Sequence, residues 1–187
     1  MTEKIREVLK CAKCVFTEVE VEAALDNMAA DMKKRIGDSS PIFLCVLVGG
    51  IIPLGHLLTR LDFPLEVDYI HVSRYGDKSR GSNVVNWKAK PATNLYDRTV
   101  VIVDDILDEG VTLAAVMDYC RSCKAKEIFT AVLLDKKKER SPGGVEDADF
   151  KGLKIDNHFV FGYGLDYKNY LRNAPGIYIV APEHLDH

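Results

Sequence analysis

The sequence predicts an α/β fold: a central, mainly parallel sheet flanked by helices, with a small lid or hood region. The first observation is three continuous apolar runs, at 42–48, 99–103 and 127–134, of the kind found in strands buried on both faces. The second is that segments with helical periodicity follow the first two runs, at 53–61 and from Thr112 onward. Strands that alternate with helices indicate a parallel sheet, because parallel strands need long crossover connections.

Two helices are expected before the first of these strands. Residues 3–14 place apolar side chains at helical spacing, and so do residues 21–32. Between them, Thr17 and Glu20 form the Thr-x-x-Glu pattern of a capping box, and Gly37 ends the second helix. We interpret both helices as packing elements.

The elements outside the three apolar runs are less regular. Two weaker strands, at 66–74 and 84–88, flank a polar loop that contains glycine. Residues 137–157 are polar and are interpreted as an excursion from the core. The chain then returns to apolar runs at 158–163 and 176–181.

Length and composition favour a single domain spanning 1–187. The chain has 187 residues, 47% of them hydrophobic and 28% charged, which allows a substantial core. A net charge of −3 argues against nucleic-acid binding through a broad basic surface. No apolar run approaches the ~18 residues that span a membrane, and the charged start of the chain does not resemble a signal peptide. We therefore expect a cytoplasmic protein.

The five cysteines are expected to be free thiols, since the chain carries no secretion signal. Cys11 with Cys14, and Cys120 with Cys123, have Cys-x-x-Cys spacing and leave zinc or redox chemistry as an alternative. Both pairs lie in segments with helical periodicity, where cysteine behaves as a small apolar residue. Packing is the favoured interpretation.

The segment 100–113, Val-Val-Ile-Val-Asp-Asp-Ile-Leu-Asp-Glu-Gly-Val-Thr-Leu, carries the clearest chemical signal. A buried strand leads into two acids, and a third acid and a glycine precede a helix. Ligands of open α/β sheets bind at the carboxyl ends of strands, and a helix N-terminus suits phosphate. An ordinary strand-to-helix turn with an Asp cap is the alternative, but a cap does not require three acids in five residues.

This segment resembles the phosphoribosyl-pyrophosphate motif of type I phosphoribosyltransferases. Further resemblances narrow the family to hypoxanthine-guanine phosphoribosyltransferases, and together they cover roughly residues 40–181 in family order. They are the loop 47–50 (Leu-Val-Gly-Gly), the segment 133–136 (Leu-Leu-Asp-Lys) with Arg140, the tail 158–167 (His-Phe-Val-Phe-Gly-Tyr-Gly-Leu-Asp-Tyr) and the residues 170–173 (Tyr-Leu-Arg-Asn).

The resemblance implies transfer of a phosphoribosyl group from 5-phosphoribosyl 1-pyrophosphate (PRPP) to a 6-oxopurine, giving IMP or GMP and pyrophosphate in purine salvage. Asp104 and Asp105 are expected to hold the ribose diol and, with Asp166, Mg²⁺. Asp108 is expected to be the general base near purine N7. The expected cradle of the 5′-phosphate is Asp108, Glu109, Gly110, Val111 and Thr112.

The resemblance also implies how the purine is bound. Lys136 is expected to donate to the 6-oxo group, which mismatches the amino group of adenine. Phe159 is expected to stack on the base and the Val160 backbone to read its edge, with Asp166 beside them. Without the resemblance, Phe159 would be interpreted as core packing. The ranking of hypoxanthine, guanine and xanthine stays open.

The leaving group has its own expected site. The loop with Val48 and Gly49 is expected to bind pyrophosphate together with Arg172 and Arg74, where a charged fork is stronger than a neutral donor. Without the resemblance, Arg172 and Asp166 would be interpreted as a surface ion pair. Arg74 and Tyr75 belong to the expected lid at 73–81, and an ordinary hairpin loop is the alternative. Residues 1–40 and 155–187 are expected to form the hood over the purine, and a homodimer or homotetramer is implied.

Four positions depart from the family pattern. In the lid, Arg74 precedes Tyr75 where Ser is frequent. Val48 stands where a charged residue is frequent, so pyrophosphate binding there must rest on backbone amides. Asp104 stands where Glu is common. Glu109 stands where a small hydroxyl residue is common, and its carboxylate is expected to point away from the phosphate.

Two other functions were weighed. A regulatory protein of the same fold would sense PRPP without catalysis, but it need not keep Asp108, Lys136 and Phe159. A nicotinamide-dependent dehydrogenase would need Gly-x-Gly-x-x-Gly early in a βαβ unit, and 162–164 lacks the third glycine. An enzyme is therefore predicted.

Overall fold

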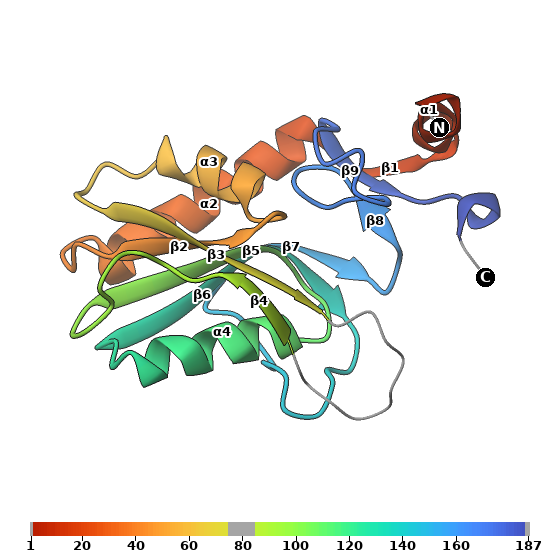
Figure 1. The fold of residues 1–187 in the computed structure, drawn as a ribbon. Helices are drawn as coiled ribbons and strands as arrows, with labels where there is room; N and C mark the ends of the chain where they lie inside the picture. Colours follow the sequence, from red (N-terminus) through yellow and green to blue (C-terminus); the bar gives the residue numbers. More distant parts are fainter. Residues whose placement is uncertain (1, 75–84, 186–187) are drawn as a thin grey trace.

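A computed structural model describes residues 2–74 and 85–185, and its centre is the predicted α/β sheet (Figure 1). Six strands lie in the order β4-β3-β2-β5-β6-β7. Neighbours from β3 to β7 are parallel, whereas β4 pairs with β3 in the antiparallel sense. The strands are β2 (Ile42–Leu47), β3 (Glu66–Arg74), β4 (Val85–Ala89), β5 (Thr99–Leu107), β6 (Glu127–Lys137) and β7 (Phe150–Asp156).

Helices cover both faces of this sheet, as a parallel sheet requires. Helices α2 (Glu18–Ile36) and α3 (Ile51–Leu58) lie on one face, and α4 (Val111–Ser122) lies on the other (Figure 1). Alternate side chains of β5 enter the two layers: Val101 packs with α2 and α3, whereas Ile102 packs with α4. This burial on both faces explains the uninterrupted apolar run.

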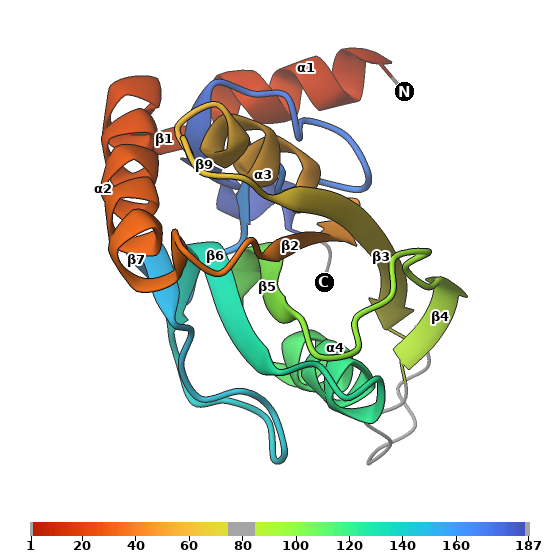
Figure 2. The same ribbon diagram turned by 90° about the vertical axis from the view of Figure 1, so that its left-hand side faces the viewer.

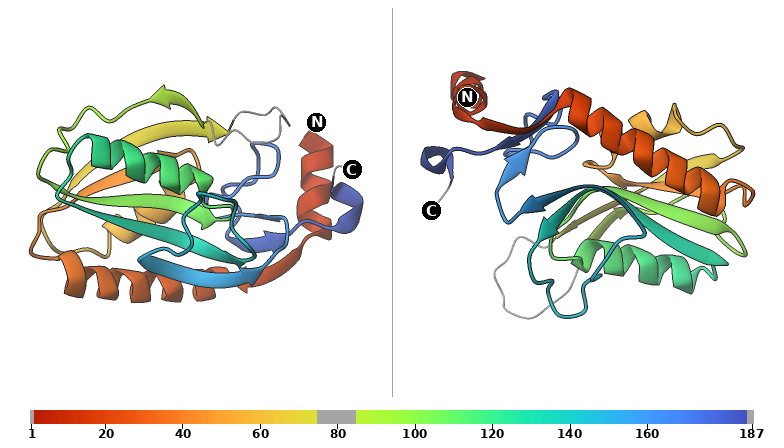
Figure 3. Two further views of the ribbon diagram at one scale, coloured as in Figure 1. Left: turned by 90° about the horizontal axis from the view of Figure 1, so that it is seen from below. Right: turned by 180° about the vertical axis from the view of Figure 1, so that it is seen from behind.

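A second, small sheet lies at one end of the large one (Figures 2 and 3). Its order is β1-β9-β8, with all pairs antiparallel, so the first and last strands of the described chain are neighbours. Helix α1 and the 3₁₀ turn η1 flank it, and Val8 packs with Phe161 and Val180. These elements are α1 (Thr2–Cys11), β1 (Lys13–Thr17), β8 (Val160–Phe161), β9 (Gly176–Ile179) and η1 (Pro182–His184).

A polar cluster ties the small sheet to the helices of the core. The carboxylate of Glu22 on α2 accepts a hydrogen bond from the hydroxyl of Tyr163, just after β8. The same carboxylate pairs with Arg60 and lies 2.8 Å from Nδ1 of His56 on α3. Three segments that are distant in sequence therefore meet at one acid.

Several sequence predictions need correction. Helix α1 ends at Cys11, and Cys14 lies in strand β1, so this cysteine pair does not share a helix. Residues 137–157 are not merely an excursion, because they contain β7, which pairs with β6. Within the apolar run at 158–163, only Val160–Phe161 forms a strand. The capping box is confirmed, with both of its hydrogen bonds formed between Thr17 and Glu20.

All five cysteines are free thiols. No helix within residues 2–74 and 85–185 has the length and apolar character needed to cross a membrane.

Candidate active site

Most of the predicted residues gather in two adjoining cavities at the carboxyl ends of β2, β5 and β6, where α/β sheets bind ligands. The first cavity has a volume of about 300 Å³ and the second about 240 Å³. Asp105, Ile106, Asp108 and Asp166 line both. The sequence motif at 100–113 and the tail segment at 158–167 therefore build one continuous site.

Asp104 and Asp105 form the floor of the first cavity and are part of β5, which continues to Leu107. Asp104 is only 8% exposed. Burial raises the pKa of both carboxyls, and repulsion by Asp105 adds to the shift at Asp104. Without a bound cation, the positive charge around Asp104 and Asp105 therefore does not fully compensate their two carboxylates.

The loop after β2 lies directly against this acid pair. A Cβ atom on Gly49 would lie 2.0 Å from Oδ2 of Asp105, so no larger residue fits there without displacing the acid. A Cβ atom on Gly164, from the tail segment, would lie 2.3 Å from the carbonyl oxygen of Gly49. Val48 precedes them, 43% exposed, and the Leu47–Val48 peptide is cis.

The loop from Asp108 to Thr112 turns the chain from β5 into α4. Gly110 is the N-cap of α4 and has φ +77°, the left-handed region that glycine adopts without strain. A Cβ atom there would also meet the carbonyl of Val145 at 2.4 Å. Thr112 faces the cavity in the first turn of a twelve-residue helix, whose free N–H groups and dipole suit an anion.

Arg172 joins the core acids to the tail segment. Its Nη2 lies 2.6 Å from Oδ1 of Asp166, and its Nη1 lies 3.8 Å from Oδ2 of Asp105. Nη1 also donates to the carbonyl of Gly164 at 2.5 Å. Asp166 and Arg172 thus form the ion pair that the alternative interpretation expects, and both also line the first cavity.

The second cavity combines one buried cation with an exposed ring. Lys136 is 8% exposed and lies at the end of β6. Phe159 is 56% exposed and lines the cavity with Val160. The core-packing interpretation of Phe159 is therefore wrong, and the ring offers an open face to a planar ligand.

Asp108 stands between the two cavities and is contacted by two lysines. Nζ of Lys136 lies 3.1 Å from Oδ2, and Nζ of Lys138 lies 2.9 Å from Oδ1. Burial alone would raise the pKa of Asp108, but the contacts with Lys138 and Lys136 outweigh it, and the pKa is lowered. Asp108 is therefore a carboxylate at neutral pH and can accept a proton.

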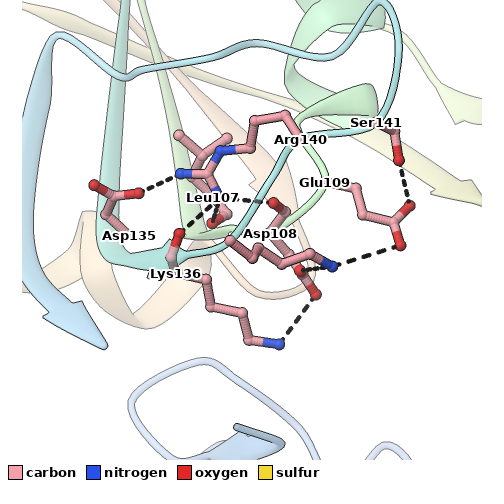
Figure 4. A network of polar contacts seen from close by, with 8 residues as sticks. Leu107, Asp108, Glu109, Asp135, Lys136, Arg140 and Ser141 are labelled. Carbon is pink, nitrogen blue, oxygen red and sulfur yellow. Dashed lines mark hydrogen bonds and ion pairs between the residues drawn. The ribbon is translucent and has the colours of Figure 1, made fainter. Parts of the chain in front are cut away.

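Figure 4 shows how the surrounding chain fixes this loop. Nη1 of Arg140 donates to the carbonyls of Leu107, Asp108 and Lys136, at 3.1, 2.7 and 2.8 Å, and its Nη2 pairs with Asp135. Arg140 and Asp135 are almost fully buried, with side chains 6% and 11% exposed. One guanidinium thus holds the end of β5 to the end of β6.

Glu109 departs from the family pattern, and its side chain has protein partners. Its Oε2 accepts from the hydroxyl of Ser141 at 3.2 Å, and its Oε1 lies 3.8 Å from Nζ of Lys138.

Some predicted residues lie elsewhere or outside the described chain. Val111 is buried at the start of α4 and does not line either cavity, and neither does Val48. Arg74 ends β3, but its side chain and all of Tyr75 lie outside the described residues. The sequence interpretation missed Lys138. No local pattern marks it, because it follows the end of β6 and reaches Asp108 only in the folded chain.

The donor set of the first cavity suits a hard divalent cation. Its lining includes one guanidinium, that of Arg172, and five carboxylates, those of Asp104, Asp105, Asp108, Glu109 and Asp166. Carboxylate oxygens are the ligands that Mg²⁺ prefers, and it binds through one or two of them together with substrate phosphates. An anionic ligand entering such a cavity needs added positive charge.

Comparison with known proteins gives a consistent result. The sequence model of the phosphoribosyl transferase domain family matches residues 16–168 of this chain. A hypoxanthine-guanine phosphoribosyltransferase of Bacillus subtilis is 33% identical over 91% of this chain and 93% of its own length. A hypoxanthine-guanine-xanthine phosphoribosyltransferase of Tritrichomonas foetus is 31% identical over 90% and 91%.

The fold is also similar to solved structures. A crystal structure of a hypoxanthine phosphoribosyltransferase from Staphylococcus aureus superposes with a TM-score of 0.87 at 27% identity. The match covers 94% of each chain.

Proposed function

The chain belongs to the hypoxanthine-guanine phosphoribosyltransferases of the phosphoribosyl transferase domain family, and from this premise we propose a role for each part of its site. The chain is an enzyme of purine salvage that transfers the phosphoribosyl group of PRPP to hypoxanthine or guanine. The relatives that match are named as enzymes, so the regulatory alternative has no support.

One observation carries the mechanism: two cavities of different chemistry meet at Asp108. One is rich in acids and faces a helix N-terminus, as a Mg²⁺–sugar phosphate requires. The other has a cation and an open aromatic ring, as a planar oxopurine requires. The bond to be formed joins the two ligands, so it must form where the cavities meet.

On the sugar side, Asp104 and Asp105 accept hydrogen bonds from the ribose diol. The N–H groups of residues 108–112 and the hydroxyl of Thr112 hold the 5′-phosphate. Support comes from the left-handed Gly110, which brings the backbone around the anion, and from the N-terminus of α4.

Asp104, Asp105 and Asp166 would hold Mg²⁺, directly or through water. When bound, the ion supplies positive charge to the pyrophosphate oxygens and so improves the leaving group. The raised pKa values of Asp104 and Asp105 support this role, because a cation relieves their desolvation and repulsion.

For the leaving group, the backbone of Val48 and Gly49 and the guanidinium of Arg172 bind pyrophosphate. Arg172 already lies in the cavity, between Asp105 and Asp166. Arg74 and Tyr75 begin the lid that closes over PRPP, and exclusion of water by that lid prevents hydrolysis of the sugar.

On the purine side, Lys136 donates to the 6-oxo group, Phe159 stacks on the base, and the Val160 backbone reads its edge, next to Asp166. Asp108 accepts the N7 proton as N9 bonds to ribose C1. Residues 1–40 and 155–187 form the hood around this site. The protein works in the cytoplasm as a homodimer or homotetramer.

A spectrophotometric assay of the purified protein tests this function. With PRPP and Mg²⁺, we expect turnover of hypoxanthine, guanine or both, and none of adenine. Chelation of the metal should abolish the reaction, because PRPP then meets five carboxylates without added cation. Binding of PRPP without turnover of any base would contradict the assignment, and undiminished turnover in excess chelator would contradict the metal role.

Lys136→Ala is expected to raise the KM for the oxopurine by roughly ten- to a hundredfold, the effect of one lost hydrogen bond to a charged group. The KM for PRPP should change by much less. Lys137→Ala is the matched control, since that exposed neighbour pairs with Asp156 on the far side of the strand. Steady-state kinetics with each substrate varied would measure both constants. Equal losses for base and sugar would refute the oxo-binding role.

A further inference from the structure

The two lysines at Asp108 cannot have the same role during turnover. Lys136 contacts Oδ2 from inside the purine cavity, and Lys138 is not among that cavity's lining residues. When a purine is bound, Lys136 has a second acceptor, the 6-oxo group. The contact between Lys136 and Asp108 then weakens at the stage of the reaction at which Asp108 must be ionised and correctly positioned.

Lys138 can keep Asp108 ionised and in position when Lys136 binds the purine. Its backbone N–H donates to the carbonyl of Lys136 at 3.0 Å in a tight turn just after β6, and its side chain reaches Asp108 as that of Lys136 does. Oδ1 of Asp108 is buried and has no hydrogen-bond donor in good geometry within the described residues, so the ammonium of Lys138 at 2.9 Å is its compensating charge. A buried carboxylate oxygen without such a partner is costly.

The same ammonium balances a second acid. Oε1 of Glu109 lies 3.8 Å from Nζ of Lys138, with Oε2 held by Ser141. Glu109 belongs to the loop that faces the 5′-phosphate, where an unbalanced carboxylate would repel the substrate. The acids across the cavity, Asp105 and Asp166, add further negative charge. A single lysine therefore serves both the base and the phosphate loop.

From this geometry we infer that Lys138 is a positioning residue of the reaction. It holds Oδ1 of Asp108, which leaves Oδ2 as the oxygen that takes the purine proton, and it neutralises Glu109 beside the 5′-phosphate. The inference rests on the proposed role of Asp108. It also accounts for an acid in the phosphate loop, because Glu109 and Lys138 form a charge pair.

Lys138→Met removes the charge and keeps the length of the side chain. We expect kcat with the oxopurine to fall about tenfold, and the KM for PRPP to rise about tenfold, each the effect of one lost charged contact. Lys138→Arg should restore both to within about threefold of wild type, since a guanidinium reaches the same two acids. A role in folding alone would lower the yield of active enzyme without raising the KM for PRPP.

A second variant separates the two functions of the lysine. In Glu109→Gln/Lys138→Met the acid that faces the phosphate is neutral, so the KM for PRPP should return close to the wild-type value. The value of kcat should stay low, because Asp108 still lacks its partner. Lys137→Met serves as the control for loss of a neighbouring lysine.

The outcomes distinguish this inference from the proposed function. If Asp108→Asn is strongly impaired but Lys138→Met keeps wild-type kcat and KM, the inference is wrong and the base assignment stands. If Asp108→Asn itself retains full activity, the base assignment fails. Recovery of kcat in the double variant would also overturn the inference, since it would make repulsion by Glu109 the whole effect.

Discussion

Asp108→Asn is expected to lower kcat with hypoxanthine or guanine by about 10²–10⁴, the range for loss of a general base. The amide keeps the shape of the side chain and removes its basicity. The N–H groups of the loop remain, so the Kd of PRPP should change little. Pre-steady-state rates and equilibrium PRPP binding would measure the two effects separately.

Two further observations sharpen this test. The contacts with Lys136 and Lys138 hold the pKa of Asp108 below its usual range, so the carboxylate stays ionised near neutral pH. Protonation of Asp108 should therefore reduce the wild-type rate only as the pH falls into the acid range. The pH–rate profile of Asp108→Asn should lack this decrease at acid pH. Asp118→Asn, on the exposed face of α4, is the matched control. A wild-type rate in Asp108→Asn would remove this acid from the mechanism.

Arg140→Met is expected to lower the free energy of unfolding by about 3–5 kcal/mol, the cost of leaving one partner of a buried ion pair uncompensated. The change strands the carboxylate of Asp135 and removes three hydrogen bonds to backbone carbonyls. Denaturant titration of both proteins would measure the difference. Because two of those carbonyls belong to Leu107 and Asp108, kcat should fall as well.

A double variant identifies the cause of that loss. In Asp135→Leu/Arg140→Met no buried charge is left, so part of the lost stability should return even though one more polar group has been removed. If the double variant were less stable than Arg140→Met, the stranded charge would not be the origin of the effect. Lys137→Met, at the same strand end but exposed, is the control for a lost cation.

The parallel core could be predicted from sequence because its signal is local. The apolar runs at 42–48, 99–103 and 127–134 mark strands buried on both faces, and the strands form there as expected. Strand β7 was missed because only Phe150 and Ile155 of its seven residues are buried and because it follows a polar loop. Strand β1 was missed because it is formed by pairing with β9, a partner that a local pattern does not reveal.

The candidate site likewise contains residues that a local sequence motif predicts and residues whose role depends on the folded chain. Asp104, Asp105 and Asp108 stand together in a long motif, and they line the cavities as expected. Arg140 was noted only for its spacing, and its buried contacts with three carbonyls depend on how the chain folds after β6. Lys138 was missed because its significance depends on a contact with Asp108, thirty positions earlier.

The pairing of β1 with β9 also bears on how the molecule is made. All six strands of the large sheet are synthesised before residues 176–179. The PRPP end of the site can therefore be organised on the nascent chain, since domains form as their contacts become available. The purine end forms later, because the small sheet between residues 13–17 and 176–179 is a long-range pairing that closes only after residues 176–179 have been made. A translating chain should thus acquire sugar-phosphate affinity first and base selectivity last.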